Sequence, residues 1–381
     1  MYQSVAQRHH ALLPRPDHDE QARQLFARDF RRYILLDVPQ HTRRIYEHAV
    51  KPALLERAPD AAAKPGSVRE AMWQQGFFRA SQGLQRISQE LLWNSVVPYV
   101  QRRAEDINER VHALGDGPGT GSLTLNPDFE VPAYLKDVDI HCMPGNYHAE
   151  YGPGDAAQGA VFDRGSFLYA LGGMGEFNDA TVRTMLQALR QRYPDLAPRR
   201  ILDLGCTMGH NTLPLCEAFP DAEIHAVDAA APMLRYAHAR ARDLGWDVHW
   251  RQADVRATGY PDGHFDLVIS VILFHEVHPD EIEAVFRECH RLLVPGGVTA
   301  HIDIPDYFKS PDPLFVTLVD ADNFHNNEPF WGEMHRRDLQ GLLARGGFPA
   351  GETFRGVAPM GTFPWSFFGA RREAAAVEAA A

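Results

Sequence analysis

A short glycine-containing turn after a predicted strand is the part of this sequence best suited to hold a cofactor. The residues RILDL suit a buried parallel strand, and this strand ends at Gly205. A dinucleotide site needs the pattern G-x-G-x-x-G, because a pyrophosphate must approach bare backbone. Counted from Gly205, the later glycines of that pattern are replaced by Thr207 and His210. The looser pattern D-x-G-x-x-x-G fits instead, with Asp203, Gly205 and Gly209.

An acidic residue stands where a bound nucleoside would need one. Residues 222–228 are predicted to form the next strand, which ends at Asp228. In doubly wound α/β proteins, a carboxylate about 20 residues beyond the glycine turn binds the ribose hydroxyls. A carboxylate suits this task because it can accept hydrogen bonds from both hydroxyls at once. Asp228 is therefore a candidate for holding the sugar of a cofactor.

Three later segments complete a pattern that resembles the class I S-adenosylmethionine-dependent methyltransferases. Residues 250–255 are similar to the end of that family's third strand, where an acid, here Asp254, meets the adenine amino group. Residues 265–270 are similar to its fourth strand, and residues 288–297 to its helix and Pro-Gly-Gly turn. The motifs follow one another at the spacing of βαβ units. The resemblance covers residues 162–370 and is close to the small-molecule and quinone-type methyltransferases.

The resemblance implies an α/β fold with S-adenosyl-L-methionine as cofactor. The expected architecture is a doubly wound, Rossmann-like, seven-stranded and mostly parallel sheet with an extra N-terminal helical region. In such sheets the ligand binds outside the carboxyl ends of the strands. The cofactor-binding residues that the resemblance implies are Tyr169, Asp203, Gly205, Cys206, Thr207, Gly209, Asn211, Asp228, Ala229, Met233, Asp254, Val255 and Ser270.

The implied activity is transfer of a methyl group to an O, N or C nucleophile of a small molecule, in keeping with secondary metabolism. The alternative is a protein of the same fold that binds the cofactor without methyl transfer, or uses it for another reaction. Two observations favour the alternative: Thr207 stands where the family often has glycine, and no nucleophile-specific signature such as N-P-P-Y is present.

The end of the fourth strand is where the resembling family presents catalytic groups, and here it carries His275 and Glu276. His275 is the first candidate for a general base or for a group that orients the substrate, because the ordinary pKa of histidine lies near neutrality. Glu276 is the second. The competing interpretation is that His275 caps the following helix or packs on the cofactor, without proton transfer.

No metal is expected at this strand end. His275, Glu276 and His278 are too closely spaced for H-E-x-x-H, whose histidines lie four apart on one helix face. His301 and Asp303 could approach the same pocket, but Asp303 and Asp306 are better explained as shaping it or binding a substrate amine. The residues expected to contact substrate are His141, Tyr147, His148, His210, His278, Asp303 and Asp306.

The composition of the chain restricts the classes of partner and the cellular location that we expect for it. The chain of 381 residues has a net charge of -12, so it lacks the basic surface that nucleic acids require. The longest apolar stretch, residues 267–274, is too short to span a bilayer. The four cysteines have no C-x-x-C pairing and are expected to be reduced thiols in a cytoplasmic protein. Arginine greatly outnumbers lysine, which favours a bacterial source.

Four regions are expected along the chain. Residues 1–122 are predicted to be helical, with helices over 20–35, 41–57 and 67–114, and to form either a dimerisation layer or a cap over the substrate pocket. Such a layer would make the protein a homodimer. The remaining regions are an irregular connecting segment at 123–161, the cofactor domain at 162–372, and a frayed tail at 373–381.

Overall fold

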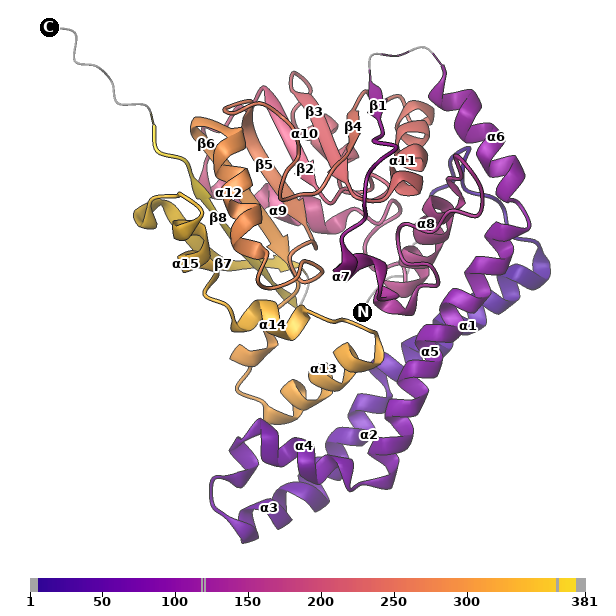
Figure 1. Cartoon of the computed structure of the whole chain (residues 1–381). Helices are drawn as coiled ribbons and strands as arrows, with labels where there is room; N and C mark the ends of the chain where they lie inside the picture. Colours follow the sequence, from indigo (N-terminus) through magenta and orange to yellow (C-terminus); the bar gives the residue numbers. More distant parts are fainter. Residues whose placement is uncertain (1–5, 118, 120, 361–362, 375–381) are drawn as a thin grey trace, which may run out of the picture.

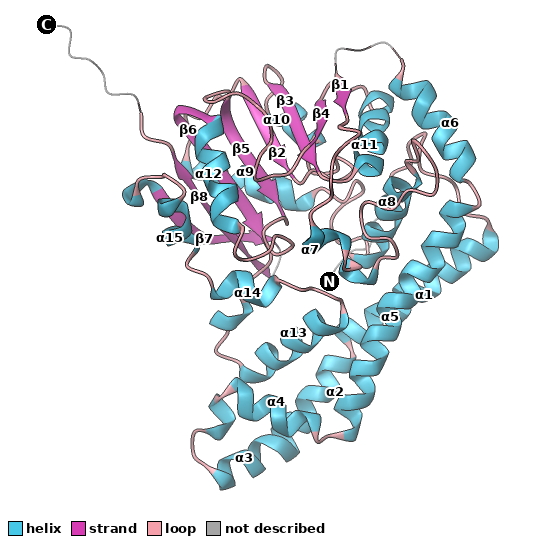
Figure 2. Ribbon diagram, viewed as in Figure 1, coloured by secondary structure: helices cyan, strands magenta, loops and turns pink. Residues whose placement is uncertain are grey.

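The computed structural model describes residues 6–117, 119, 121–360 and 363–374. It contains one mixed sheet with helices on both faces, and a helical arm that extends from one side of the sheet (Figures 1 and 2). We use "helical arm" for residues 18–115, which hold α1 to α6. This arrangement confirms the predicted α/β fold and the extra N-terminal helical region.

The sheet has eight strands rather than the seven expected. Their order is β1-β4-β3-β2-β5-β6-β8-β7, and all neighbours are parallel except the pairs formed by β8. The additional strand, β1, pairs with β4 and thereby covers what would have been an open sheet edge. The strands are β1 (Ser122–Thr124), β2 (Arg200–Leu204), β3 (Glu223–Asp228), β4 (His249–Gln252), β5 (Phe265–Val271), β6 (Leu293–Asp303), β7 (Thr353–Met360) and β8 (Phe363–Arg371).

The helix predicted over 20–35 is confirmed as α1 (His18–Leu36), whereas the other two predicted stretches are divided. The stretch expected over 67–114 is three helices, because the chain leaves helical geometry at Gln75 and again at Arg103. The stretch over 41–57 contains a turn of π-helix at Tyr46–Val50. The arm consists of α1 (His18–Leu36), α2 (Val38–Ile45), α3 (Lys51–Arg57), α4 (Pro65–Trp73), α5 (Gly76–Gln101) and α6 (Ala104–Gly115).

The remaining helices surround the sheet and close the space between it and the arm. The α13 helix packs against α4 and α5 of the arm, far from it in sequence. None of the helices in the described ranges has the length and apolar character needed to cross a membrane. These helices are α7 (Ala133–Lys136), α8 (Ala157–Tyr169), α9 (Ala180–Arg192), α10 (Leu213–Ala218), α11 (Ala231–Asp243), α12 (Ile282–Leu292), α13 (Pro313–His325), α14 (Trp331–Arg336) and α15 (Leu339–Arg345).

One hydrophobic core joins the arm to the sheet. Trp93 and Val96 of α5 share it with Val161 of α8 and with Met233 and Tyr236 of α11. The α8 helix itself crosses the boundary expected at residue 162, because its buried side chains continue through both sides of that position. The segment 123–161, expected to be irregular, thus contributes β1, α7 and the start of α8.

The contact between α5 and α8 depends on a glycine. An alanine methyl group at Gly165 would lie 2.1 Å from the ring of Trp93, which is 1% exposed. We expect Gly165→Ala to lower the free energy of unfolding by about 1–3 kcal/mol, because the buried ring must move. Urea unfolding measures this change.

Gly83→Ala is the matched control, since Gly83 is also helical and has no neighbour within 4 Å of a built methyl group. It should stabilise the protein by about 0.5–1 kcal/mol. A Gly165→Ala protein as stable as the wild type would contradict the close packing of α5 on α8.

Candidate active site

A cavity of about 920 Å³ lies at the carboxyl ends of the parallel strands. Its floor is formed by the residues that follow β2, β3, β4, β5 and β6, and its walls include side chains of α1, α2, α5 and α13. This is the position at which open α/β sheets bind ligands, because the loops after neighbouring strands diverge there. The arm therefore lines the same cavity as the sheet.

The glycine turn after β2 has the backbone conformation that its pattern predicts. Gly205 and Gly209 have φ values of +70° and +79°, and methyl groups there would collide with Leu273 and Trp250. Thr207 also has a positive φ, +45°, which costs a non-glycine residue roughly 1–2 kcal/mol. Its N–H donates to the Asp228 carboxylate at 2.8 Å. The threonine therefore occupies a glycine-like conformation.

Asp228 is fixed at the end of β3 and lines the cavity. One of its carboxylate oxygens accepts from the Thr207 N–H and the other from the Ala230 N–H, both at 2.8 Å. Burial raises the pKa of Asp228 to about 6, opposed by these N–H groups. Each oxygen keeps a second acceptor position, so the carboxylate fits the two hydroxyls of a ribose.

The segment after β4 lines the cavity with small and apolar groups. Ala253, Asp254 and Val255 are in the wall, beside Ala229 after β3. Both oxygens of Asp254 are engaged by the guanidinium group of Arg256, whose Nε lies 3.0 Å from each of them. An adenine ring fits the apolar surface here, whereas Asp254 is less free to bind it than Asp228 is to bind a ribose.

Several expected cofactor contacts lie beneath the cavity floor. Asp203 is buried and accepts from the Thr212 hydroxyl at 2.6 Å, and burial raises its pKa to about 7. Ser270 is bonded to His301 at 2.8 Å. Neither lines the cavity, nor do the buried Cys206, Gly209 and Met233. The cofactor-site predictions that do line it are Tyr169, Gly205, Thr207, Asn211, Asp228, Ala229, Asp254 and Val255.

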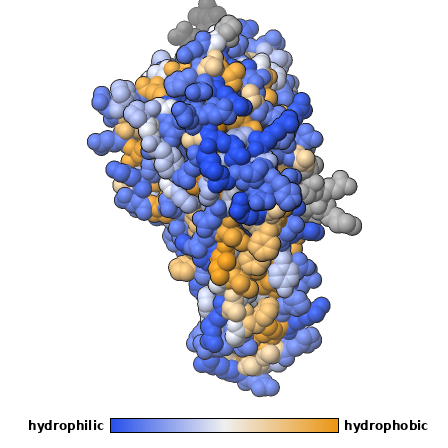
Figure 3. All heavy atoms as spheres, turned by 90° about the vertical axis from the view of Figure 1, so that its right-hand side faces the viewer, coloured by the Kyte–Doolittle hydropathy of each residue, from blue (hydrophilic) through white to orange (hydrophobic). Residues whose placement is uncertain are grey.

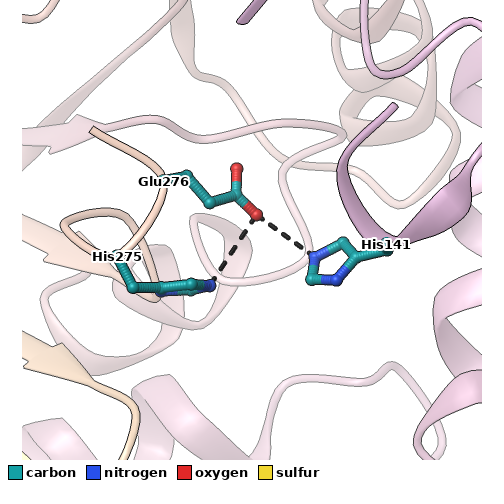
Figure 4. A group of neighbouring side chains, drawn as sticks. All are labelled: His141, His275 and Glu276. Carbon is teal, nitrogen blue, oxygen red and sulfur yellow. Dashed lines mark ion pairs between the residues drawn. The ribbon is translucent and has the colours of Figure 1, made fainter. Parts of the chain in front are cut away.

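A cluster of histidines and glutamates lies at another part of the same cavity. We call His141, His275, Glu276 and Glu328 the His–Glu cluster; all four line the cavity. Nε2 of His141 lies 3.2 Å from Oε1 of Glu276, and Nε2 of His275 lies 3.9 Å from the same oxygen (Figure 4). The Tyr147 hydroxyl donates to this oxygen at 2.7 Å.

His275 is held from behind by Asp303, which is fully buried at the end of β6. Its Nδ1 lies 2.8 Å from Oδ1 of Asp303. The same oxygen accepts from the Ile304 N–H, and Oδ2 accepts from the Phe274 N–H. Burial lowers the pKa of His275, but the charge and hydrogen bond of Asp303, together with the charges of Glu276 and Glu328, outweigh burial and raise the pKa to about 9. Because Nδ1 is committed to Asp303, Nε2 is the nitrogen that His275 presents to the cluster.

His141 comes from a different part of the chain and is held by the arm. Its carbonyl oxygen accepts hydrogen bonds from Gln89 and Trp93 of α5, both at 2.7 Å. Its Nδ1 lies 2.6 Å from Oε1 of Glu328. Burial lowers the pKa of His141, but Glu328 and Glu276 raise it to about 10. The arm thus fixes one member of the His–Glu cluster.

The other expected substrate contacts differ in position. His148 and His210 line the cavity, and burial lowers the pKa of His210 to about 4, so it is neutral. Asp306 lines the cavity but is paired with Arg355 at 3.0 Å. His278 does not line it; its exposed ring packs on Phe330.

Sequence analysis did not single out Glu328. It lies in the segment after α13, and its spacing and neighbours form no motif. The structure buries its side chain against His141 and His275. Glu328 becomes a candidate site residue only when the structure shows which side chains surround it.

Comparisons with known proteins identify the class of domain that this chain carries. Residues 201–297 match a family model described as a methyltransferase domain. A demethylmenaquinone methyltransferase from Thermus thermophilus is 38% identical over 120 residues, which are 30% of this chain and 54% of the relative. A trans-aconitate 2-methyltransferase from Methylobacterium radiotolerans is 35% identical over 145 residues, 38% of this chain and 52% of the relative.

Among solved structures, the S-adenosylmethionine-dependent methyltransferase SibL in its apo form is 17% identical, with a TM-score of 0.46 over 90% of this chain and 98% of that one. The matches in sequence define the class: the chain carries a class I S-adenosylmethionine-dependent methyltransferase domain. It spans about half the length of these two curated relatives.

Proposed function

We propose that this protein transfers the methyl group of S-adenosylmethionine to an O, N or C atom of a small molecule bound in the cavity. The observation that carries the proposal is one cavity with two unlike parts. One part has the glycine turn, Asp228 and the apolar surface after β4, which fit an adenosine. The other has the His–Glu cluster, which suits a polar acceptor.

The bound cofactor supplies an activated methyl group on a sulfonium. The protein then has to position the acceptor, exclude water and take up any proton that the acceptor loses. We propose His275 and Glu276 as the catalytic pair. In support, Asp303 fixes the imidazole of His275 so that Nε2 faces Glu276, as a buried aspartate does for the histidine of a catalytic triad.

The helical arm is proposed to be a cap on the acceptor site. Ile34 and Val38 line the cavity together with Phe315 and Leu318 of α13, so this part of the wall is apolar. An acceptor with an apolar body and a polar reactive end matches this distribution. Under this proposal residues 1–122 act together with the domain at 162–372 rather than as a separate unit.

A second copy of this chain is the partner we propose for the outer face of the arm. Apolar side chains gather on the lower part of that face in Figure 3. Phe26 and Tyr33 of α1 and Ile87 of α5 are among the large apolar residues exposed in the arm. We also propose a bacterial cytoplasmic location; the four buried, unpaired cysteines support a reducing compartment.

The proposed function is tested with methyl-labelled S-adenosylmethionine and a panel of phenols, amines and carboxylic acids. Mass spectrometry should detect S-adenosylhomocysteine together with an acceptor that has gained the labelled methyl group. Cofactor binding by calorimetry without a methylated product across the panel would support the alternative, a cofactor-binding protein without methyl transfer.

A further inference from the structure

The His–Glu cluster brings three metal-ligating atoms together from separate segments. Nε2 of His141, Nε2 of His275 and a carboxylate oxygen of Glu276 all lie within 4.8 Å of one another. His141 precedes the methyltransferase domain in sequence, whereas His275 and Glu276 follow β5. In Figure 4 both imidazole rings point a nitrogen at the Glu276 carboxylate. Two histidines and one carboxylate form a recurrent metal-binding set that leaves other positions open.

Each imidazole has a second carboxylate at its other nitrogen, in a hydrogen bond for His275 and in an ion pair for His141. Nδ1 of His275 is 2.8 Å from Asp303, and Nδ1 of His141 is 2.6 Å from Glu328. Histidines that bind metals almost always donate their second N–H to such a partner, which fixes the tautomer and ring orientation. Both Nε2 atoms are thereby left for a shared ligand.

Glu328 gives an independent sign that a cation belongs here. Its Oε2 is buried and has no hydrogen-bond partner among the described residues, and its side chain is 1% exposed. This oxygen lies 3.8 Å from Nε2 of His275. A buried carboxylate oxygen without a partner is costly, because it has lost its water and gained nothing in exchange. A cation near the two Nε2 atoms would supply the missing partner.

The charges of the cluster also suit a dication. Glu276, Glu328 and Asp303 bring three carboxylates to two imidazoles. The described cavity lining has Arg31 and Lys309 as its only Lys or Arg side chains. Lys309 is paired with Asp306, and Arg31 is bonded to Gln89. Neither cation is paired with a carboxylate of the cluster.

We propose that His141, His275 and Glu276 bind one divalent first-row transition-metal ion, with Glu328 as a further ligand. The mixed nitrogen and oxygen donors favour Zn²⁺, Fe²⁺, Co²⁺ or Mn²⁺ over Ca²⁺ and Mg²⁺, which prefer oxygen alone. The ion replaces the proton on each Nε2. Sequence reasoning expected no metal after considering the residues near His275 together with His301 and Asp303; it did not include His141, which comes from another segment.

The chemical role of the ion rests on the proposed function. The binding of the ion does not. An ion at this place faces the cavity and acts as a Lewis acid on an acceptor that offers an oxygen ligand. The substrate class is then a hydroxyl-bearing molecule, such as a phenol. Its proton would be released to solvent as its oxygen binds the ion, and the oxygen would take the methyl group from the sulfonium, which leaves as S-adenosylhomocysteine. With the ion bound, His275 positions the acceptor through the metal and is not itself the proton acceptor.

The test uses the full-length protein after treatment with a chelator and dialysis. Calorimetric titration with ZnCl₂ should show one site with a Kd of micromolar or below, and CoCl₂ should give visible absorption bands of protein-bound cobalt. His141→Ala and Glu276→Gln should each weaken Zn²⁺ binding at least about 10-fold. His48→Ala, which removes an exposed histidine of the arm, should leave it unchanged.

Circular dichroism and S-adenosylmethionine titration show whether each variant is folded. Glu328→Gln, which keeps the side-chain shape, is the second variant if His141→Ala unfolds. The inference is overturned if the wild type binds no stoichiometric Zn²⁺, or if folded cluster variants bind it as the wild type does. Zn²⁺ binding without methyl transfer would overturn the proposed function instead and leave the metal site standing.

Discussion

Replacing His275 with alanine is expected to lower turnover by about 100-fold or more while S-adenosylmethionine affinity stays within about twofold of the wild type. The imidazole is paired with Asp303 and lies near Glu276 and Glu328, so we expect its loss to affect the acceptor more than the cofactor. Single-turnover kinetics and calorimetry measure the two quantities separately. His48→Ala is the control for removal of an imidazole.

The His275→Asn variant distinguishes a chemical role of His275, in proton transfer or metal binding, from a role in packing alone. Asparagine keeps a polar group near Asp303 but cannot place a basic nitrogen at Nε2. Turnover close to that of the wild type in this variant would show that His275 only shapes the cavity. A comparable loss in both variants would support a chemical role for the second ring nitrogen.

Asp228→Ala is expected to weaken S-adenosylmethionine binding by about 1–3 kcal/mol, or roughly 5- to 150-fold. The substitution leaves the ribose hydroxyls without an acceptor and frees the N–H groups of Thr207 and Ala230. Asp254→Ala is the matched control and should weaken binding less, because that carboxylate is already engaged by Arg256. Equal losses in the two variants would contradict the different roles assigned to these acids.

The assignment of Asp228 to the ribose also predicts that the affinity for S-adenosylmethionine depends on pH. The pKa of Asp228 is raised by burial to about 6, so the carboxylate is ionised above this pH and protonated below it. Protonation removes an acceptor from the ribose site, so affinity should be constant above about pH 6 and should fall as the pH decreases through that value. In Asp228→Asn this pH dependence should be absent. A wild-type affinity independent of pH between 5 and 7 would contradict the ribose contact.

The backbone of the candidate cofactor site could be predicted from sequence because its signals are local. The strand before Gly205, the turn itself and the acid at the end of β3 lie within 30 residues, and each motif specifies its own backbone geometry. β1 could not be predicted, because three residues beside a glycine-rich linker show no periodicity. Its place in the sheet is decided by β4, far along the chain.

The part of the cavity that holds the His–Glu cluster is built from segments that are distant in sequence. His275 was found because it follows a recognisable strand, but its partners His141, Asp303 and Glu328 lie on three other segments. No spacing in the sequence links them. Met233 and Ser270 were expected to contact the cofactor because of their positions in the motifs. In the structure neither residue lines the cavity.

The hydrogen bonds from Gln89 and Trp93 to the carbonyl of His141 have a consequence for engineering and for evolution. Recombination that exchanged the arm for that of a related enzyme would preserve the glycine turn and the cofactor site. It would also remove the two hydrogen-bond donors that fix His141, and with them the position of this residue in the His–Glu cluster. Under the proposed function the arm and the sheet act as one unit, and we expect substrate preference to change through substitutions along the apolar wall rather than through exchange of the arm.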